Sequence, residues 1–138
     1  MPQATTQARP TGPPGYSQTL LRKPESAAAA RRLIDAALCC WGLGELADDG
    51  ASIVTELVTN AVRHARRGSI RVVVERITER TVRVAVSDFS RELPVKCRAG
   101  DGDEEGRGLL LVAALASDWG TYTRRWGKVV WADLEGCR

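Results

Sequence analysis

The most informative segment of the chain is Thr55-Glu-Leu-Val-Thr-Asn-Ala-Val-Arg-His64. On a helical wheel of residues 49–65, the apolar side chains fall within one arc and the polar ones occupy the opposite arc. The apolar arc consists of Val54, Leu57, Val58, Ala61, Val62 and Ala65. The polar arc consists of Glu56, Thr59, Asn60, Arg63 and His64. This pattern predicts an amphipathic helix from about Asp49 to Ala65, with one face in the core.

Glu56 and Asn60 are the residues of this helix best suited to chemistry. They are four positions apart, so both side chains lie on the same helical face. A carboxylate there can orient or deprotonate a nucleophile, and an amide oxygen one turn away can ligate a hard cation such as Mg²⁺. The same spacing is also typical of a solvated helix face, so the pair needs support from other features of the sequence.

The segment before this helix divides into a tail, a strand and an earlier helix. Four of its first 16 residues are proline and almost none is large and apolar, which predicts a disordered tail over residues 1–16. Residues 17–22 form a candidate strand that Pro24 ends. Ser26 is the predicted N-cap of a helix that runs from Ala27 to about Trp41.

The segment after residue 65 alternates between strands, a loop and one more helix. Residues 70–74 and 82–86 each have valine or isoleucine at every second position, and the short connection between them predicts a hairpin. Residues 90–108 are rich in glycine and acids, which predicts a long loop. A helix over 109–116 and a hairpin around Trp126-Gly127 complete the chain.

Hairpins that form a sheet, together with helices that must cover one face of that sheet, predict an α+β fold. We expect a two-layer α/β sandwich, in which helices cover one face of a mixed, mostly antiparallel sheet. The four tryptophans are expected to pack in the core and in the last hairpin. The arginines that alternate along the strands are expected to form a solvated face.

Two further features have the chemistry of a ligand site. Asp88 directly follows the apolar strand, and its carboxylate can accept a hydrogen bond from an exocyclic amine, although strand-ending turn aspartates are common. The run Glu105-Gly-Arg-Gly-Leu109 opens a helix. Free N–H groups at a helix N-terminus attract anions, and glycines let a phosphate approach the backbone. Glycine pairs are common, so this run is a weak signal by itself.

Composition limits the classes of protein that the chain can represent. Its 138 residues, 43% of them hydrophobic, fit one domain. The longest apolar run is far shorter than a membrane span of about 20 residues. The four cysteines lack the spacing of a disulfide or metal framework, which predicts reduced thiols in a cytoplasm. Two of the three net positive charges lie in the first 25 residues, so the charge of the remainder does not favour binding to nucleic acid.

Taken together and in this order, these features resemble the nucleotide-binding domain of the GHKL superfamily, the histidine-kinase-like ATPases. That superfamily has a helix with this Glu and Asn pattern, an aspartate after a strand, a lid and a Gly-x-Gly helix start. The resemblance covers about residues 17–134 and implies a histidine-kinase-like ATP-binding domain over 17–138 with the Bergerat-type fold. The small size is similar to that of the stand-alone anti-sigma-factor serine/threonine kinases.

The resemblance also implies roles for individual residues. Glu56 would be the general base, Asn60 would ligate Mg²⁺ and Asp88 would recognise the adenine amine. The residues implied to lie near the phosphates of ATP are Arg63, His64, Gly106, Arg107, Gly108 and Leu109. The implied partners are a sigma factor and an anti-anti-sigma protein, with no direct contact to nucleic acid or membrane and with homodimers as in many relatives.

The sequence departs from the family pattern after Asp88. The family has Asp-x-Gly-x-Gly there, whereas this chain has Asp88-Phe-Ser-Arg-Glu92. This departure keeps open an alternative, in which the same fold is a catalytically weak or inactive partner-binding module. A third interpretation, a small basic protein that binds nucleic acid, predicts an affinity that falls steeply with salt.

Overall fold

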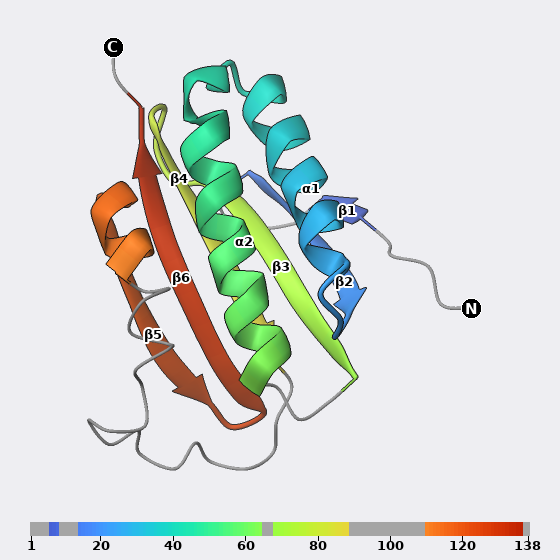
Figure 1. Ribbon diagram of the computed structural model, residues 1–138. Coiled ribbons are helices and arrows are strands. Elements are labelled where there is room, and N and C mark those ends of the chain that lie inside the picture. Colours follow the sequence, from blue (N-terminus) through green and yellow to red (C-terminus); the bar gives the residue numbers. More distant parts are fainter. Residues whose placement is uncertain (1–5, 9–13, 65–67, 89–109, 137–138) are drawn as a thin grey trace.

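The computed structural model describes residues 6–8, 14–64, 68–88 and 110–136. Figure 1 shows two layers, a twisted sheet and the helices that cover one of its faces. The strands are β1 (Thr6–Ala8), β2 (Gly15–Leu21), β3 (Ser69–Arg76), β4 (Thr81–Asp88), β5 (Asp118–Arg124) and β6 (Gly127–Glu135). The helices are α1 (Ser26–Cys40), the 3-10 turn η1 (Gly44–Leu46), α2 (Ala47–His64) and a short helix over 110–115.

The six strands form one sheet in the order β1-β2-β3-β4-β6-β5. Every neighbouring pair in it is antiparallel. The α+β fold and the sandwich predicted from the sequence are therefore confirmed. The prediction for residues 1–16 differs from the structure in part, because β1 and the start of β2 lie within that segment.

The core lies between the sheet and the helices. Alternate residues of the central strands are buried against α1 and α2, among them Val72, Val84 and Ala132. The buried face of α2 matches the predicted apolar arc in Val54, Leu57, Val58 and Ala61, and it also includes Ile53. Burial of each valine, leucine or isoleucine side chain among them stabilises the fold by roughly 1.5–3 kcal/mol. Because α2 is fixed along this whole face, the position of its polar face is fixed too.

The start of α1 corrects one sequence prediction. Ser26 is the first residue of the helix rather than its N-cap, and the cap position is Glu25, which makes no side-chain capping bond. The Ser26 hydroxyl is buried and donates a hydrogen bond of 2.6 Å to the carbonyl oxygen of Leu21. The turn at Pro24 directs this side chain toward the end of β2. The hydroxyl therefore donates its hydrogen bond to the strand and not to the helix.

The turn between β3 and β4 shows how a polar residue fixes a hairpin. The hydroxyl oxygen of Thr78 accepts hydrogen bonds from the backbone N–H groups of Arg80 and Thr81. The resulting register pairs Val74 with Val84 and Arg71 with Ser87. The alternating apolar residues predict this hairpin, and the structure confirms it. In the described part of the chain, no helix is both long enough and apolar enough to cross a membrane.

Candidate functional site

Asn60 lies on α2 at the boundary between the core and the solvent. The residue is half-buried, and its side-chain oxygen Oδ1 is fully buried with no hydrogen-bond partner among the described residues. A buried polar atom left without a partner costs roughly 1–3 kcal/mol. Such an atom is expected where a ligand completes the bonding, and an amide oxygen is a suitable ligand for a hard cation.

Glu56 is one helical turn before Asn60, about 6 Å along the axis. Both residues are half-buried, whereas Thr59 between them is exposed. They therefore lie on the edge of α2 that borders the core rather than on its fully solvated side. A carboxylate and an amide oxygen therefore lie close together on this edge of α2.

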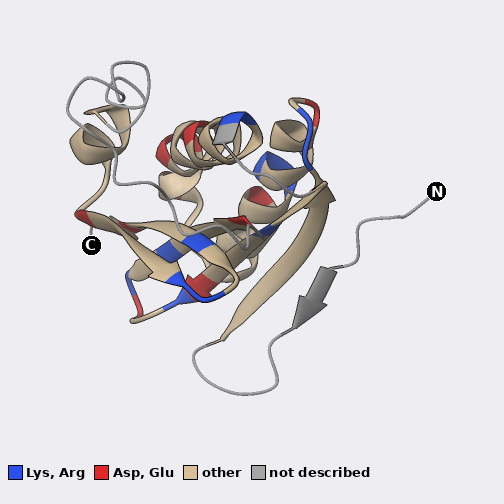
Figure 2. Ribbon diagram, turned by 90° about the horizontal axis from the view of Figure 1, so that it is seen from below, with Lys and Arg blue, Asp and Glu red and all other residues tan. Residues whose placement is uncertain are grey.

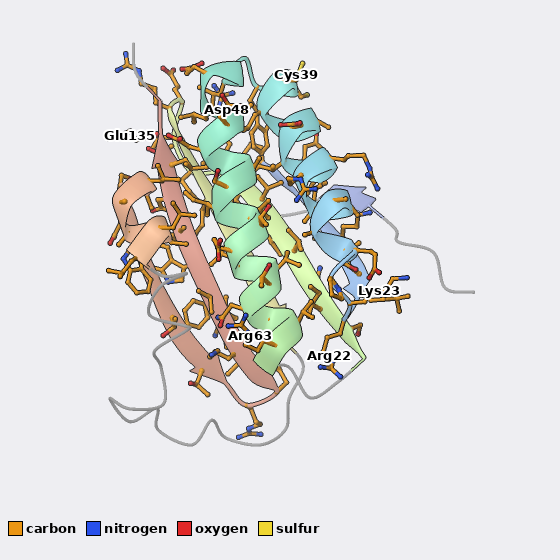
Figure 3. All side chains as sticks on the ribbon, in the orientation of Figure 1. Arg22, Lys23, Cys39, Asp48, Arg63 and Glu135 are labelled. Carbon is orange, nitrogen blue, oxygen red and sulfur yellow. The ribbon has the colours of Figure 1, made fainter. Side chains whose placement is uncertain are left out.

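Arg63 and His64 form the end of α2. Arg63 is exposed, and Figure 3 shows its side chain near the C-terminal end of the helix. His64 is the last residue of α2, and its side chain lies outside the described part of the structure. A cationic side chain near Asn60 can neutralise a polyanion bound beside the helix.

Asp88 is the last residue of β4 and is buried, with 6% of its surface exposed. Its Oδ1 accepts a hydrogen bond of 3.1 Å from the backbone N–H of Lys128, at the start of β6. A backbone donor fixes the orientation of the carboxylate without a compensating positive charge. Asp88 is thus a pre-oriented acceptor, as recognition of an amine requires.

Gly127 makes this arrangement sterically possible. A Cβ atom at Gly127 would lie 2.1 Å from the backbone oxygen of Asp88 and 2.9 Å from its Oδ1. Real Cβ atoms essentially never come within 3.0 Å of another heavy atom, so any other residue here would displace Asp88. Gly127 and Lys128 are not among the site residues predicted from the sequence. The sequence feature that could have indicated them is a glycine at the first position of the last strand, directly after Trp126.

The structure brings the α2 residues and Asp88 to the same end of the sheet. In Figure 1, the C-terminal end of α2 and the end of β4 both lie at the lower edge, beside the start of β6. The predicted phosphate residues Gly106, Arg107, Gly108 and Leu109 lie outside the described residues. The described part of the site is therefore a candidate cation ligand, a carboxylate and an oriented acceptor.

The chain matches the family described as the histidine kinase-like ATPase domain over residues 20–133. In fold it is similar to the "Histidine kinase domain from Erythrobacter litoralis EL346 blue-light activated histidine kinase", with 25% sequence identity and a TM-score of 0.52. That similarity covers 79% of this chain and 60% of the Erythrobacter chain, so the match spans less than two thirds of the solved protein. No curated protein matches the sequence.

The fold, the two-layer arrangement and the family match together define a GHKL-type ATP-binding domain. The chain belongs to the histidine kinase-like ATPase family.

Proposed function

We propose that the protein is an ATP- and Mg²⁺-dependent serine/threonine protein kinase of the anti-sigma type, which phosphorylates an anti-anti-sigma partner. The observation that carries the proposal is the buried, unsatisfied Oδ1 of Asn60, one turn from Glu56 on the edge of α2. Membership in an ATP-binding family supports the nucleotide as the ligand.

The residues fit the two groups that the family implies. The orphaned oxygen of Asn60 suits Mg²⁺, and the Asp88 carboxylate oriented by Lys128 suits the exocyclic amine of adenine. Mg²⁺ neutralises charge on the phosphates when it is bound. Arg63 is proposed to add positive charge there, with His64 nearby. The residues proposed to line the phosphates are Gly106, Arg107, Gly108 and Leu109.

In this proposal Glu56 acts as the general base. It accepts the proton of a serine or threonine hydroxyl of the partner protein as that oxygen attacks the terminal phosphorus of ATP. The bond from phosphorus to the bridging oxygen breaks, and ADP leaves. General-base catalysis of this kind contributes about 10²–10⁴-fold to the rate.

The biological setting is proposed from the same family likeness. The partners would be a sigma factor, which is bound and inhibited, and an anti-anti-sigma protein, which is the substrate. Use of ATP favours the cytoplasm, and the exposed free thiols of Cys39 and Cys40 agree with a reducing compartment.

A phosphotransfer assay tests the proposal. Purified protein is incubated with radiolabelled ATP and purified anti-anti-sigma candidates, and label on the partner is followed with time. Glu56→Gln is expected to lower the rate at least a hundredfold while ATP affinity stays within a factor of two. The matched control is Glu79→Gln, on the exposed β3–β4 turn, which leaves the rate unchanged.

A second candidate function is suggested by the departure after Asp88. The loss of both glycines from the family pattern favours a partner-binding module in which nucleotide is structural or absent. In that case neither the parent protein nor the Glu56→Gln variant transfers phosphate, and both still form a complex with the partner. Failure of transfer by the parent protein to every candidate, with intact partner binding, supports this second function.

A further inference from the structure

The sheet face opposite α1 and α2 contains a groove that the proposed nucleotide site does not use. Figure 2 shows charged residues along the strands, with the described helices all on one side of the sheet. The groove has a volume of about 540 Å³ and crosses strands β3, β4, β6 and β5. Because the sheet separates the groove from α2, a ligand can occupy the groove whether or not the proposed nucleotide site is functional.

The strand register explains how the groove is built. Arg71 pairs with Ser87, Ser87 with Val129, and Val129 with Tyr122. Cross-strand partners point to the same face of a sheet, so these four side chains form one row across it. Strands are about 4.8 Å apart, which separates the backbones of Arg71 and Tyr122 by roughly 14 Å.

One end of the groove is basic. Arg71 on β3 and Arg124 on β5 both line it. Arg71 donates a hydrogen bond of 3.1 Å to the Ser17 hydroxyl, and the Arg124 guanidinium lies 4.6 Å from the centre of the Tyr122 ring. Both of these neighbours are neutral, and a neutral neighbour orients a guanidinium without cancelling its charge. The two side chains can therefore attract carboxylates.

The floor of the groove is apolar, and two aromatic side chains lie at its basic end. Val73 and Ala85 are cross-strand partners that line its floor. Tyr122 and Trp126 line it as well, and each keeps 42% of its surface exposed. Exposed aromatic side chains beside arginines are enriched in protein interfaces.

The same face also contains acidic groups, which distinguish between two kinds of anionic partner. Glu75 lines the groove four residues from Arg71, or roughly 13 Å along β3. Its cross-strand partner is Arg83, which forms a salt bridge of 2.7 Å with Asp133, so this row has two carboxylates and one guanidinium. A uniformly charged nucleic-acid backbone that followed the groove would meet the net negative charge of this row. A peptide with acidic residues at one end only avoids that repulsion.

We propose that this groove binds an extended acidic peptide segment of a protein partner. Carboxylates of the segment contact Arg71 and Arg124 at the end of the groove where Tyr122 and Trp126 also lie, and apolar side chains that follow them pack over Val73 and Ala85. Charge complementarity of this kind gives the partner its orientation along the strands.

Fluorescence anisotropy with a short labelled peptide tests the proposal. The peptide carries a cluster of aspartates followed by leucine, valine and phenylalanine, and no ATP is present, so that failure of the nucleotide site does not affect the result. Arg71→Glu and Arg124→Glu are each expected to weaken binding about tenfold or more. Arg32→Glu, an exposed change on α1, is the matched control and leaves the affinity unchanged.

A charge swap gives the sharpest outcome. A peptide with lysines in place of the aspartates should bind the Arg71→Glu/Arg124→Glu variant better than it binds the parent protein. Trp126→Ala should weaken binding of the acidic peptide as well, with circular dichroism confirming that each variant is folded. The proposal is overturned if the acidic peptide does not bind, if Arg32→Glu weakens binding as much as Arg124→Glu does, or if an oligothymidine competes more strongly than the peptide. It is also overturned if sedimentation shows that the parent protein is a dimer and that Trp126→Ala is a monomer.

Discussion

The backbone N–H of Lys128 donates a hydrogen bond of 3.1 Å to Oδ1 of Asp88, forty residues earlier in the chain. The two residues are adjacent because β4 and β6 are neighbours in the sheet. This contact couples the last hairpin of the fold to the carboxylate that is proposed to recognise adenine. A change in that hairpin should therefore alter nucleotide affinity.

Gly127→Ala should disturb both the fold and the site. The added Cβ would lie 2.1 Å from the backbone oxygen of Asp88, so β6 or the end of β4 must move. We expect a loss of about 1–3 kcal/mol in the free energy of unfolding, as for other overpacked sites, together with at least tenfold weaker ATP binding. Urea denaturation and calorimetry measure the two effects.

Gly44→Ala is the control for that substitution. No atom lies within 4 Å of a Cβ built at Gly44, so the free energy of unfolding and the ATP affinity should both be close to those of the parent protein. Equal behaviour of the two alanine variants would show that the close approach of Gly127 to Asp88 is unimportant.

Asp88→Asn separates recognition from folding. The amide oxygen of asparagine can still accept the hydrogen bond from Lys128, so stability should change by less than about 1 kcal/mol. The neutral side chain is a weaker acceptor than a carboxylate, and its NH₂ group would oppose the amine of adenine. We expect ATP affinity to fall at least tenfold, measured by calorimetry on a variant with an unchanged thermal transition. GTP has a carbonyl oxygen where adenine has that amine, so it should lose less affinity. An equal loss for ATP and GTP would contradict the assigned role of Asp88.

Leu38→Ala tests the packing that fixes α1 to α2. Leu38 is fully buried, and its Cδ1 lies 3.3 Å from a Cβ built at Gly50 of α2. Removal of such a side chain leaves a cavity and costs about 2–5 kcal/mol. Urea denaturation should show this loss, whereas Ala36→Ser, an exposed change on the same helix, should cost less than about 0.5 kcal/mol. A cost below about 1 kcal/mol for Leu38→Ala would mean that the helix pair is loosely packed.

Arg83 and Asp133 allow a double-mutant cycle on the sheet face opposite α1 and α2. The guanidinium donates two hydrogen bonds of 2.7 and 3.0 Å to the carboxylate and also lies 4.3 Å from the centre of the Trp131 ring. The hydrogen bonds to Asp133 raise the pKa of Arg83 above its ordinary value. Because Arg83 is partly exposed, we expect a coupling energy of only about 1 kcal/mol between Arg83→Met and Asp133→Asn. Thermal unfolding of the four proteins gives the value, and strictly additive effects would show that the pair contributes nothing.

The local sequence is sufficient to predict the elements that have a strong period. Val54, Leu57 and Val58 are buried as the helical wheel requires, and Glu56 and Asn60 lie outside the core. The alternating valines of β3 and β4 also predict their hairpin. In these segments a single buried face decides the structure, so the hydrophobic pattern contains the information.

Contacts between distant segments cannot be predicted in this way. The bond from Lys128 to Asp88 depends on the order of strands in the sheet, which no local pattern specifies. Trp126 is expected from the sequence to pack in the hairpin, but it is exposed beside the groove, because it lies in the turn and not in the register that faces the helices. The start of α1 differs for a similar reason, since the Ser26 hydroxyl bonds to Leu21 of a neighbouring strand.

Asn60 and Asp88 are proposed to belong to one site for ATP and Mg²⁺, and the functional proposal depends on this pairing. A calorimetric titration of the purified protein with ATP, with and without Mg²⁺ and alongside Asn60→Ala, tests it. We predict saturable binding that requires Mg²⁺ in the parent protein and is lost in the variant, while both proteins unfold at similar temperatures. Binding that is indifferent to Mg²⁺ and to Asn60→Ala, or no binding at millimolar ATP, would contradict the proposed site.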